Sequence, residues 1–288
     1  MYKVNKLTFS HPKYPEQLKH IPTPPKELYV AGNLSALETP YSLSVIGSRK
    51  PTSYGLSVVD ALVEPVAARQ ITIVSGLALG IDAAAHKTAL RTQGKAIAVL
   101  AGGLDEIHPR RHHQLAKEII RLGGALISEY PPGTPPTRGQ FVARNRIVSG
   151  LSQATLIIEA AIKSGTLHTA NFALEQGRGV LAVPGSILSP QSEGTNRLIR
   201  QGARPTLEAS DIFDELGLVE EPASEKTYRA ASEQEAILLK LLAEAGIIEG
   251  QELLEKSELD TQSYNQTMTM LELSGKIRSL GADNWSLH

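Results

Sequence analysis

The sequence contains no cysteine, which excludes disulfide bonds, thiolate metal sites and a cysteine nucleophile. Aromatic side chains are also scarce, at 5% of the 288 residues. No apolar run approaches the roughly 18 residues that suggest a membrane-spanning helix, and the first residues lack the apolar segment of a signal peptide. The histidines of HPRRHH, residues 108–113, have no matching carboxylates or thiolates, so we expect no metal. A cytoplasmic globular protein is the default expectation.

The whole chain has almost no net charge, but the charge is distributed unevenly along it. The formal net charge is −1, but residues 232–288 hold ten acidic and four basic side chains and sum to −6. The preceding 231 residues therefore carry +5. A basic body with an acidic appendage indicates different partners for the two parts.

Short, continuous apolar runs alternate with helical patterns from residue 42 onward. We predict strands at 42–46, 71–75, 95–100, 125–129, 154–159 and 179–185, and helices near 55–69, 81–91, 111–122, 141–151, 165–177 and 193–202. Continuous apolar strands are typical of a parallel sheet covered on both faces. The sequence therefore predicts a doubly wound α/β fold with a mostly parallel sheet.

The chain divides into four parts by composition. Residues 1–40 contain six prolines and read as an amino-terminal lead-in packed on the core, with a short helix or strand. The α/β domain spans 41–216, and 217–231 reads as a linker. Residues 232–288 begin with a serine-capped amphipathic helix and predict three helices and a hairpin, which is the outline of a winged helix–turn–helix.

Glycines follow several predicted strands at the edge where their carboxyl ends meet. Such glycines let backbone N–H groups approach an anion closely, with help from the following helix dipole. One such turn is weak evidence, but several on one edge exceed what turn geometry requires. We predict backbone contacts to phosphate at Gly47, Gly76, Gly102 and Gly185.

Basic side chains occupy the same joints. Arg49 and Lys50 follow the first strand, Lys163 precedes Ser164 and Gly165 after a later one, and TRGQFVARNR (137–146) supplies further arginines around Phe141. A basic strip with one interleaved aromatic suits a single-stranded nucleic acid, because cations take phosphates and the ring stacks on a base. Taken singly, Phe141 fits a core position, and Arg144 and Arg146 could equally bridge neighbouring helices.

Signals for catalysis are weaker. A Walker A lysine motif is absent, so nucleotide hydrolysis by that route is not expected. Asp82 and His86 are spaced to share a hydrogen bond, for which a structural role is favoured over acid–base work. Glu159 is the one carboxylate near the predicted edge, and an ion pair with a nearby arginine is its favoured role. A nucleotide-binding or nucleotide-processing enzyme with a Rossmann-like core stays open as the alternative function.

A set of long motifs now makes a resemblance visible. The chain resembles the DprA/Smf family (DNA-processing protein A) over about residues 8–216, and the tail resembles that family's winged helix more loosely. The motifs run in the family's order: IGSRKPTSYG, SGLALGIDAAAHKTAL, IAVLAGGLDEIHP, SEYPPGTPP, FVARNRIVSGLS, EAAIKSGTLHTANFALEQGR and VPGSILSPQSEGTNRLIRQGA.

The resemblance implies an extended Rossmann-like core, no catalysis and no cofactor. It implies a protein that binds single-stranded DNA, generally as a homodimer, protects incoming strands and loads the RecA recombinase on them during natural transformation. By motif position it also assigns the DNA-binding side chains, which are Ser48, Arg49, Arg138, Phe141, Arg144, Arg146 and Lys163. From the residues themselves we add Lys50, Ser164 and Gly165 to this set.

The sequence departs from the family pattern in places. Val142 stands where the family often has proline, and His108 where it often has tyrosine; neither change removes a cation. An amino-terminal helical domain found in many members is not expected here. The predicted recognition helix TQSYNQTMTMLEL in the acidic tail has no lysine or arginine, so we expect the tail to contact a protein or the same chain rather than duplex DNA.

Overall fold

The computed structural model describes residues 3–218, 230, 232–281 and 283–287. The chain divides into two compact units, residues 1–220 and 221–288. Most of the predicted linker 217–231 lies outside the described residues, and the four predicted domain boundaries stay predictions. Among the described residues, no helix combines the length and the apolar character needed to cross a membrane.

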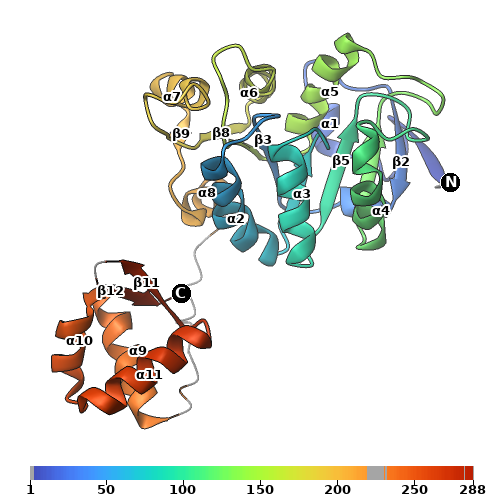
Figure 1. Cartoon of the computed structure of the whole chain (residues 1–288). Coiled ribbons are helices and arrows are strands. Elements are labelled where there is room, and N and C mark those ends of the chain that lie inside the picture. Colours follow the sequence, from blue (N-terminus) through green and yellow to red (C-terminus); the bar gives the residue numbers. More distant parts are fainter. Residues whose placement is uncertain (1–2, 219–229, 231, 282, 288) are drawn as a thin grey trace. The chain divides into compact units, whose positions relative to one another are not determined.

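The first unit is built on a nine-stranded sheet (Figure 1). Its strands are β1 Val4–Thr8, β2 Glu27–Gly32, β3 Ser42–Ile46, β4 Thr72–Ser75, β5 Ala96–Leu100, β6 Ala125–Ser128, β7 Ala154–Ile157, β8 Gly179–Ala182 and β9 Arg204–Pro205. Its helices are α1 Glu16–Lys19, η1 Leu34–Leu37, α2 Ser53–Ala68, α3 Ile81–Arg91, η2 Arg110–His112, α4 His113–Arg121, α5 Arg138–Gly150, α6 Thr166–Glu175, α7 Glu193–Arg200 and α8 Ala209–Glu215.

The sheet is mostly parallel and doubly wound, so the predicted α/β class is confirmed. Strand order is β1-β2-β6-β5-β4-β3-β7-β8-β9, and β3 through β9 pair in parallel. The chain proceeds outward from β3 to β6 on one side and then returns to β7 on the other. The order therefore reverses beside β3, and in open α/β sheets ligands bind at such a switch point, outside the carboxyl ends of the strands.

Helices cover both faces of this sheet. Helices α1, α5, α6 and α7 pack in one hydrophobic cluster against it, whereas α2, α3 and α8 share a second cluster and α3 and α4 a third. Figure 1 shows α2, α3 and α4 side by side on one side of the strands. All five residues of β3 are buried, as a strand covered on both faces requires.

Strand β3 fixes α5 through hydroxyl groups as well as apolar contacts. Leu43 and Val45 belong to the cluster of α2 and α3. On the alternate positions, the Ser44 hydroxyl donates to the Val148 carbonyl at 2.7 Å and lies 2.9 Å from Ser152 Oγ. Because a buried hydroxyl is costly without a partner, these bonds set the rotation of α5 relative to the sheet.

The amino-terminal segment differs from its prediction. Residues 1–40 read as a lead-in with a short helix or strand, but β1 and β2 join the sheet and pair antiparallel with each other, with β2 antiparallel to β6. Proline-rich stretches between the strands hid this pattern. The short β9 and helix α8 were also not predicted.

The second unit contains helices α9 Glu233–Ala245, α10 Gly250–Ser257 and α11 Thr261–Leu273 and strands β10 Ile247–Glu249, β11 Ile277–Gly281 and β12 Asn284–Leu287. Its strands form an antiparallel sheet in the order β10-β12-β11, over a separate apolar core. The predicted Ser232 cap is present, since its hydroxyl accepts from the Glu235 N–H at 3.1 Å. These elements agree with the predicted content, and the winged-helix assignment stays a prediction.

Candidate nucleic-acid interface

A groove of about 680 Å³ lies at the carboxyl ends of β3, β4 and β7, beside the switch point. It is lined by the end of β3 and residues 47–50, by Gly76 and Ala78 after β4, by one side of α5, and by residues 163–166 at the start of α6. Eleven of the predicted site residues line it: Gly47, Ser48, Arg49, Lys50, Gly76, Arg138, Phe141, Arg144, Lys163, Ser164 and Gly165. The sequence therefore located this groove, while the DNA-binding role of each residue stays a prediction.

The loop after β3 is held by its own polar groups. The Ser48 hydroxyl is buried and accepts from the Lys50 N–H at 3.1 Å, and the Ser48 carbonyl accepts from the Ile81 N–H at 3.1 Å. A side chain on Gly47 would meet Ile81, because its Cβ would lie 2.7 Å from Cγ1. Gly47 therefore serves close packing onto α3. This rigid turn leaves Arg49 and Lys50 exposed at the groove.

Helix α5 brings a cation and the aromatic ring to the opposite wall. Thr137 and Gln140 form a capping box at its start, which satisfies their two backbone N–H groups. Arg138 is exposed, and Phe141 is half-buried with the Arg49 guanidinium 5.6 Å from its ring centroid. The His108 ring meets Phe141 edge-on at 5.7 Å. Phe141 is therefore oriented at the groove rather than enclosed in the core.

The loop after β7 supplies the third side of the groove. Lys163 is exposed, and the Ser164 hydroxyl lies 2.9 Å from Thr166 Oγ1 and accepts from the Thr166 N–H at 3.2 Å. Thr166 in turn donates to the Gly47 carbonyl at 3.1 Å, which joins the loops after β3 and β7 across the switch point. Sequence reasoning missed Thr166 and also Asn145, which is four residues after Phe141 on the same helical face.

Arg144 lines the groove but is a buried residue rather than an exposed cation. Its Nη1 donates to the Gly76 carbonyl at 2.6 Å and to the Val99 carbonyl, and its Nε donates to Asn145 Oδ1 at 3.2 Å. Burial lowers the pKa of Arg144 to about 10, partly offset by the nearby Asp82 charge, so it stays protonated at neutral pH. It adds positive potential beneath the groove while joining α5 to two strand ends.

Arg146 is not in the groove, contrary to its predicted place among the DNA contacts. Its guanidinium forms a bidentate pair with Glu129 at 2.6 and 3.0 Å and donates to the Thr23 carbonyl at 2.9 Å. Arg144 and Arg146 flank Asn145 on the helix, and each step of about 100° turns them in opposite directions. The RNR motif thus contributes one arginine to the groove and one to the packing of the amino-terminal segment.

Three of the predicted phosphate-binding glycines have other structural roles. The Gly76 N–H donates to the Asp82 carboxylate at 3.0 Å, and the Gly185 N–H donates to Asn196 Oδ1 at 3.2 Å. Gly102 is buried, and a Cβ there would lie 2.8 Å from the Thr134 carbonyl oxygen. Neither Gly102 nor Gly185 lines the groove. Close packing and these hydrogen bonds give the three glycines structural roles, and their contacts to phosphate stay predictions.

The two carboxylates considered for catalysis are also held by other groups. Glu159 is buried and accepts from the Thr52 N–H at 2.9 Å and from its hydroxyl, at the start of α2. The predicted ion pair between Glu159 and an arginine is therefore wrong, because Glu159 forms no ion pair among the described residues. Asp82 accepts from the Gly76 and Ala78 N–H groups. The predicted bond to His86 is absent, and both ring nitrogens of the buried His86 lack a partner among the described residues.

The groove is strongly cationic. Arg49, Lys50, Arg138 and Lys163 are exposed, and none of these four forms an ion pair among the described residues. The only acidic side chain that lines the groove in the described part of the chain is the buried Asp82. Exposed cations without partners favour an anionic ligand, and their spread over two loops and the start of α5 suits several phosphates rather than one.

Comparisons with known proteins agree with this geometry. The family model described as "DNA recombination-mediator protein A" matches residues 5–217, most of the first unit. Protein Smf of Escherichia coli is 47% identical over 238 residues, which are 81% of this chain and 63% of that protein. The DNA processing protein DprA of Bacillus subtilis is 42% identical over 74% of this chain and 71% of its own length. The chain thus spans about two thirds of these relatives.

Solved structures show the same relationship. The DNA processing protein A of Streptococcus pneumoniae aligns with a TM-score of 0.69 and 38% identity, over 74% of each chain. The corresponding protein of Helicobacter pylori, described with a unique single-stranded DNA binding mode, aligns with a TM-score of 0.68 and 31% identity over 75% of this chain and 96% of its own. With its sequence and its fold in agreement, this chain belongs to the DNA recombination-mediator protein A family.

Proposed function

We propose that this protein is a recombination mediator that binds single-stranded DNA in the groove at the switch point of its sheet. One observation carries the proposal: four exposed cations, which form no ion pair among the described residues, line a groove of about 680 Å³ together with the half-buried ring of Phe141. Cations on two loops and at the start of α5 can follow a backbone of successive phosphates, and the ring offers a stacking surface that accepts any base.

The arrangement favours a single strand over a duplex. Bases in a duplex are already stacked and paired, so a side chain can stack on a base face only where the strand is open. Three of the four exposed cations, Arg49, Lys50 and Lys163, lie on loops after strands rather than on a helix that could enter a major groove and read base edges. Binding should therefore tolerate any sequence and weaken with salt.

The family resemblance supports the wider role. In this proposal the protein protects incoming single strands and loads the RecA recombinase on them during natural transformation, as a homodimer in the cytoplasm. It does so without catalysis: Glu159, the carboxylate considered as a catalytic group, is held by Thr52 and does not line the groove. A gel-filtration and light-scattering measurement tests the dimer, and RecA filament assembly on coated strands tests loading.

The groove is tested by the double substitution Arg49→Ala/Lys163→Ala, which removes two exposed cations from separate loops. Each phosphate contact adds about 0.7 to the slope of log affinity against log salt on single strands, so the slope should fall by about 1.4. The control Lys95→Ala/Lys117→Ala removes the same charge at exposed positions outside the groove. Equal affinities and slopes for the two double variants on oligothymidylate would refute the proposed groove.

We further propose that the acidic second unit contacts protein rather than duplex DNA. Helix α11 carries no lysine or arginine and exposes Met270 and Leu273, with 55% and 78% of their surface accessible. Acidic surroundings repel phosphates, whereas exposed apolar side chains suit a protein contact. Because this unit has its own apolar core, a fragment of residues 232–288 can be titrated with duplex DNA, and binding at physiological salt would contradict the proposal.

A further inference from the structure

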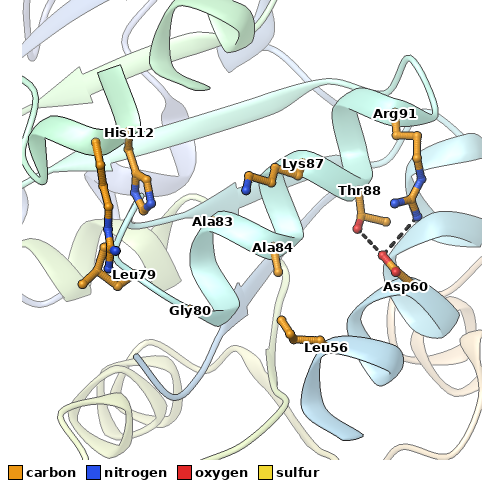
Figure 2. A pocket seen from close by; sticks show the side chains of 11 residues that line it. Leu56, Asp60, Leu79, Gly80, Ala83, Ala84, Lys87, Thr88, Arg91 and His112 are labelled. Carbon is orange, nitrogen blue, oxygen red and sulfur yellow. Dashed lines mark hydrogen bonds and ion pairs between the residues drawn. The ribbon is translucent and has the colours of Figure 1, made fainter. Parts of the chain in front are cut away.

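A second groove, of about 580 Å³, lies on the surface formed by α2, α3 and η2 (Figure 2). Small residues of α3, Ala83 and Ala84, line it together with Gly80 at the helix start, and Leu56 of α2 faces them. Lys87, Arg91, Arg111 and His112 supply its basic groups. None of these residues belongs to the predicted site, and no aromatic side chain other than the His112 imidazole lines this groove.

The two grooves meet at residues 78–80, a short segment of chain that we call the wall. Ala78 lines the first groove, and Leu79 and Gly80, the next two residues, line the second. The wall is tightly packed: Gly80 has φ of +84°, and a Cβ there would lie 2.2 Å from the Ser48 carbonyl oxygen. Arg49 follows Ser48 directly, so the second groove begins next to the cations of the first.

Charge in the second groove is uneven. At one end, Arg91 donates to Asp60 at 3.0 Å and pairs with Glu64 at 3.1 Å, and the Thr88 hydroxyl also donates to Asp60. Figure 2 shows Arg91, Thr88 and Asp60 at one side of the groove, with His112 and Leu79 at the other and Lys87 between them. Lys87 and Arg111 are exposed and form no ion pair among the described residues.

His112 lies at the end of the groove opposite Asp60, and one of its two ring nitrogens has a hydrogen-bond partner. Its Nδ1 lies 2.8 Å from the Leu77 carbonyl, and because a carbonyl only accepts, that nitrogen carries the proton. The ring is thereby fixed against the loop that separates the grooves. Lys87 and Arg111 carry the positive charge of the second groove that no ion pair offsets among the described residues.

We propose that the second groove binds the phosphates of nucleotides that flank those held in the first groove, so that one DNA strand crosses the wall at Gly80. This inference rests on the proposed function of the first groove. The small side chains of α3 leave room for a sugar–phosphate backbone between Lys87 and Arg111. Because no stacking ring is present, the second groove contacts the backbone and leaves the bases free.

The first test uses oligothymidylates of increasing length with the double variant Lys87→Ala/Arg111→Ala. Its affinity for the shortest strand that the wild-type protein binds should be unchanged. For longer strands, the salt slope should fall by about 1.4 and the gain in affinity with length should shrink. The control Lys95→Ala/Lys117→Ala should behave as the wild type at every length.

The outcomes separate this inference from the proposed function. If the wild-type protein binds no oligothymidylate, or Arg49→Ala/Lys163→Ala has no effect, the first groove fails. If those results hold but Lys87→Ala/Arg111→Ala matches the wild type at every length, the second groove alone is refuted. An equal loss on the shortest strand would also refute it, since the two grooves would not hold separate nucleotides.

A second measurement does not depend on affinity. The sequence has no cysteine, so Lys87→Cys introduces a single thiol whose alkylation rate can be followed. A long oligothymidylate should slow alkylation several-fold, the shortest bound strand should not, and Lys95→Cys should be unaffected by either. Replacing the flanking nucleotides with abasic sites should preserve the protection. Undiminished alkylation under a saturating long strand would overturn the inference.

Discussion

The guanidinium of Arg49 lies over the ring of Phe141, 5.6 Å from its centroid, although the two residues are 92 positions apart in the sequence. The loop after β3 supplies the cation and the first turn of α5 supplies the ring. A cation near an aromatic face is attracted to it, so the two side chains help hold each other at the groove. A strand entering the groove meets a phosphate ligand and a stacking surface in adjacent places.

Phe141→Ala should weaken single-strand binding by about 1–3 kcal/mol, or roughly 5- to 150-fold, because a base loses its stacking partner. Phe141→Trp should retain most of the affinity. Val142→Ala, at the exposed neighbouring position of the same groove, is the control. Fluorescence anisotropy with a labelled oligothymidylate measures all three. Equal affinities for Phe141→Ala and Val142→Ala would exclude a stacking role.

Arg146→Ala should lower stability more than DNA affinity. Its guanidinium is largely buried and makes charge-assisted hydrogen bonds to Glu129 and to the Thr23 carbonyl. Losing such bonds costs about 2–3 kcal/mol of the free energy of unfolding, which urea denaturation monitored by circular dichroism can measure. Arg138→Ala, on the exposed start of the same helix, should lower DNA affinity more than the free energy of unfolding. A large loss of affinity with unchanged stability for Arg146→Ala would return this arginine to the groove.

Gly76→Ala should destabilise the protein by about 1–3 kcal/mol, because overpacking a close contact forces its neighbours to move. The new Cβ would lie 2.5 Å from Nη2 of Arg144, whose guanidinium is buried between strand ends. Gly139→Ala is the matched control, since nothing lies within 4 Å of its added Cβ. Thermal unfolding compares the two. A Gly76→Ala variant as stable as Gly139→Ala would show that Arg144 can move away.

Acidification should destabilise the first unit through His86. Burial lowers the pKa of His86 to about 3, with smaller effects of His112 and Arg144. The unfolded chain binds this proton near pH 6.5, so the stability is complete above that pH and is lost as pH falls toward 3. At pH 5 the loss from this group is about 2 kcal/mol. Unfolding free energies at pH 7.5 and pH 5 measure it.

The matching variant is His86→Leu, which removes the titrating group and two ring nitrogens that lack partners among the described residues. Its stability should match or exceed that of the wild type at pH 7.5, because an unsatisfied polar group is no longer buried. It should also lose less stability between pH 7.5 and pH 5. The same acid sensitivity in both proteins would assign the effect to other groups.

The fold of the α/β core could be predicted closely from the sequence. The strand at 42–46 and the helix at 81–91 were predicted with the bounds that the structure shows. Both are strong local signals, a continuous apolar run before a glycine and an alanine-rich stretch after one. The antiparallel strands β1 and β2 were missed because nothing local marks them: Tyr29 finds its partner in Ser128, far along the chain.

The groove was also located from the sequence, because the carboxyl ends of parallel strands must meet at one edge. The sequence could not decide which of the clustered arginines face it. That depends on the rotation of α5, which the bond from the buried Ser44 hydroxyl to the Val148 carbonyl helps to fix. The alternation of strands and helices in the core and the identity of the motifs could thus be predicted from the sequence. Exposure is decided by tertiary packing, which points Arg49 at the groove, buries Arg144 beneath it and pairs Arg146 with Glu129.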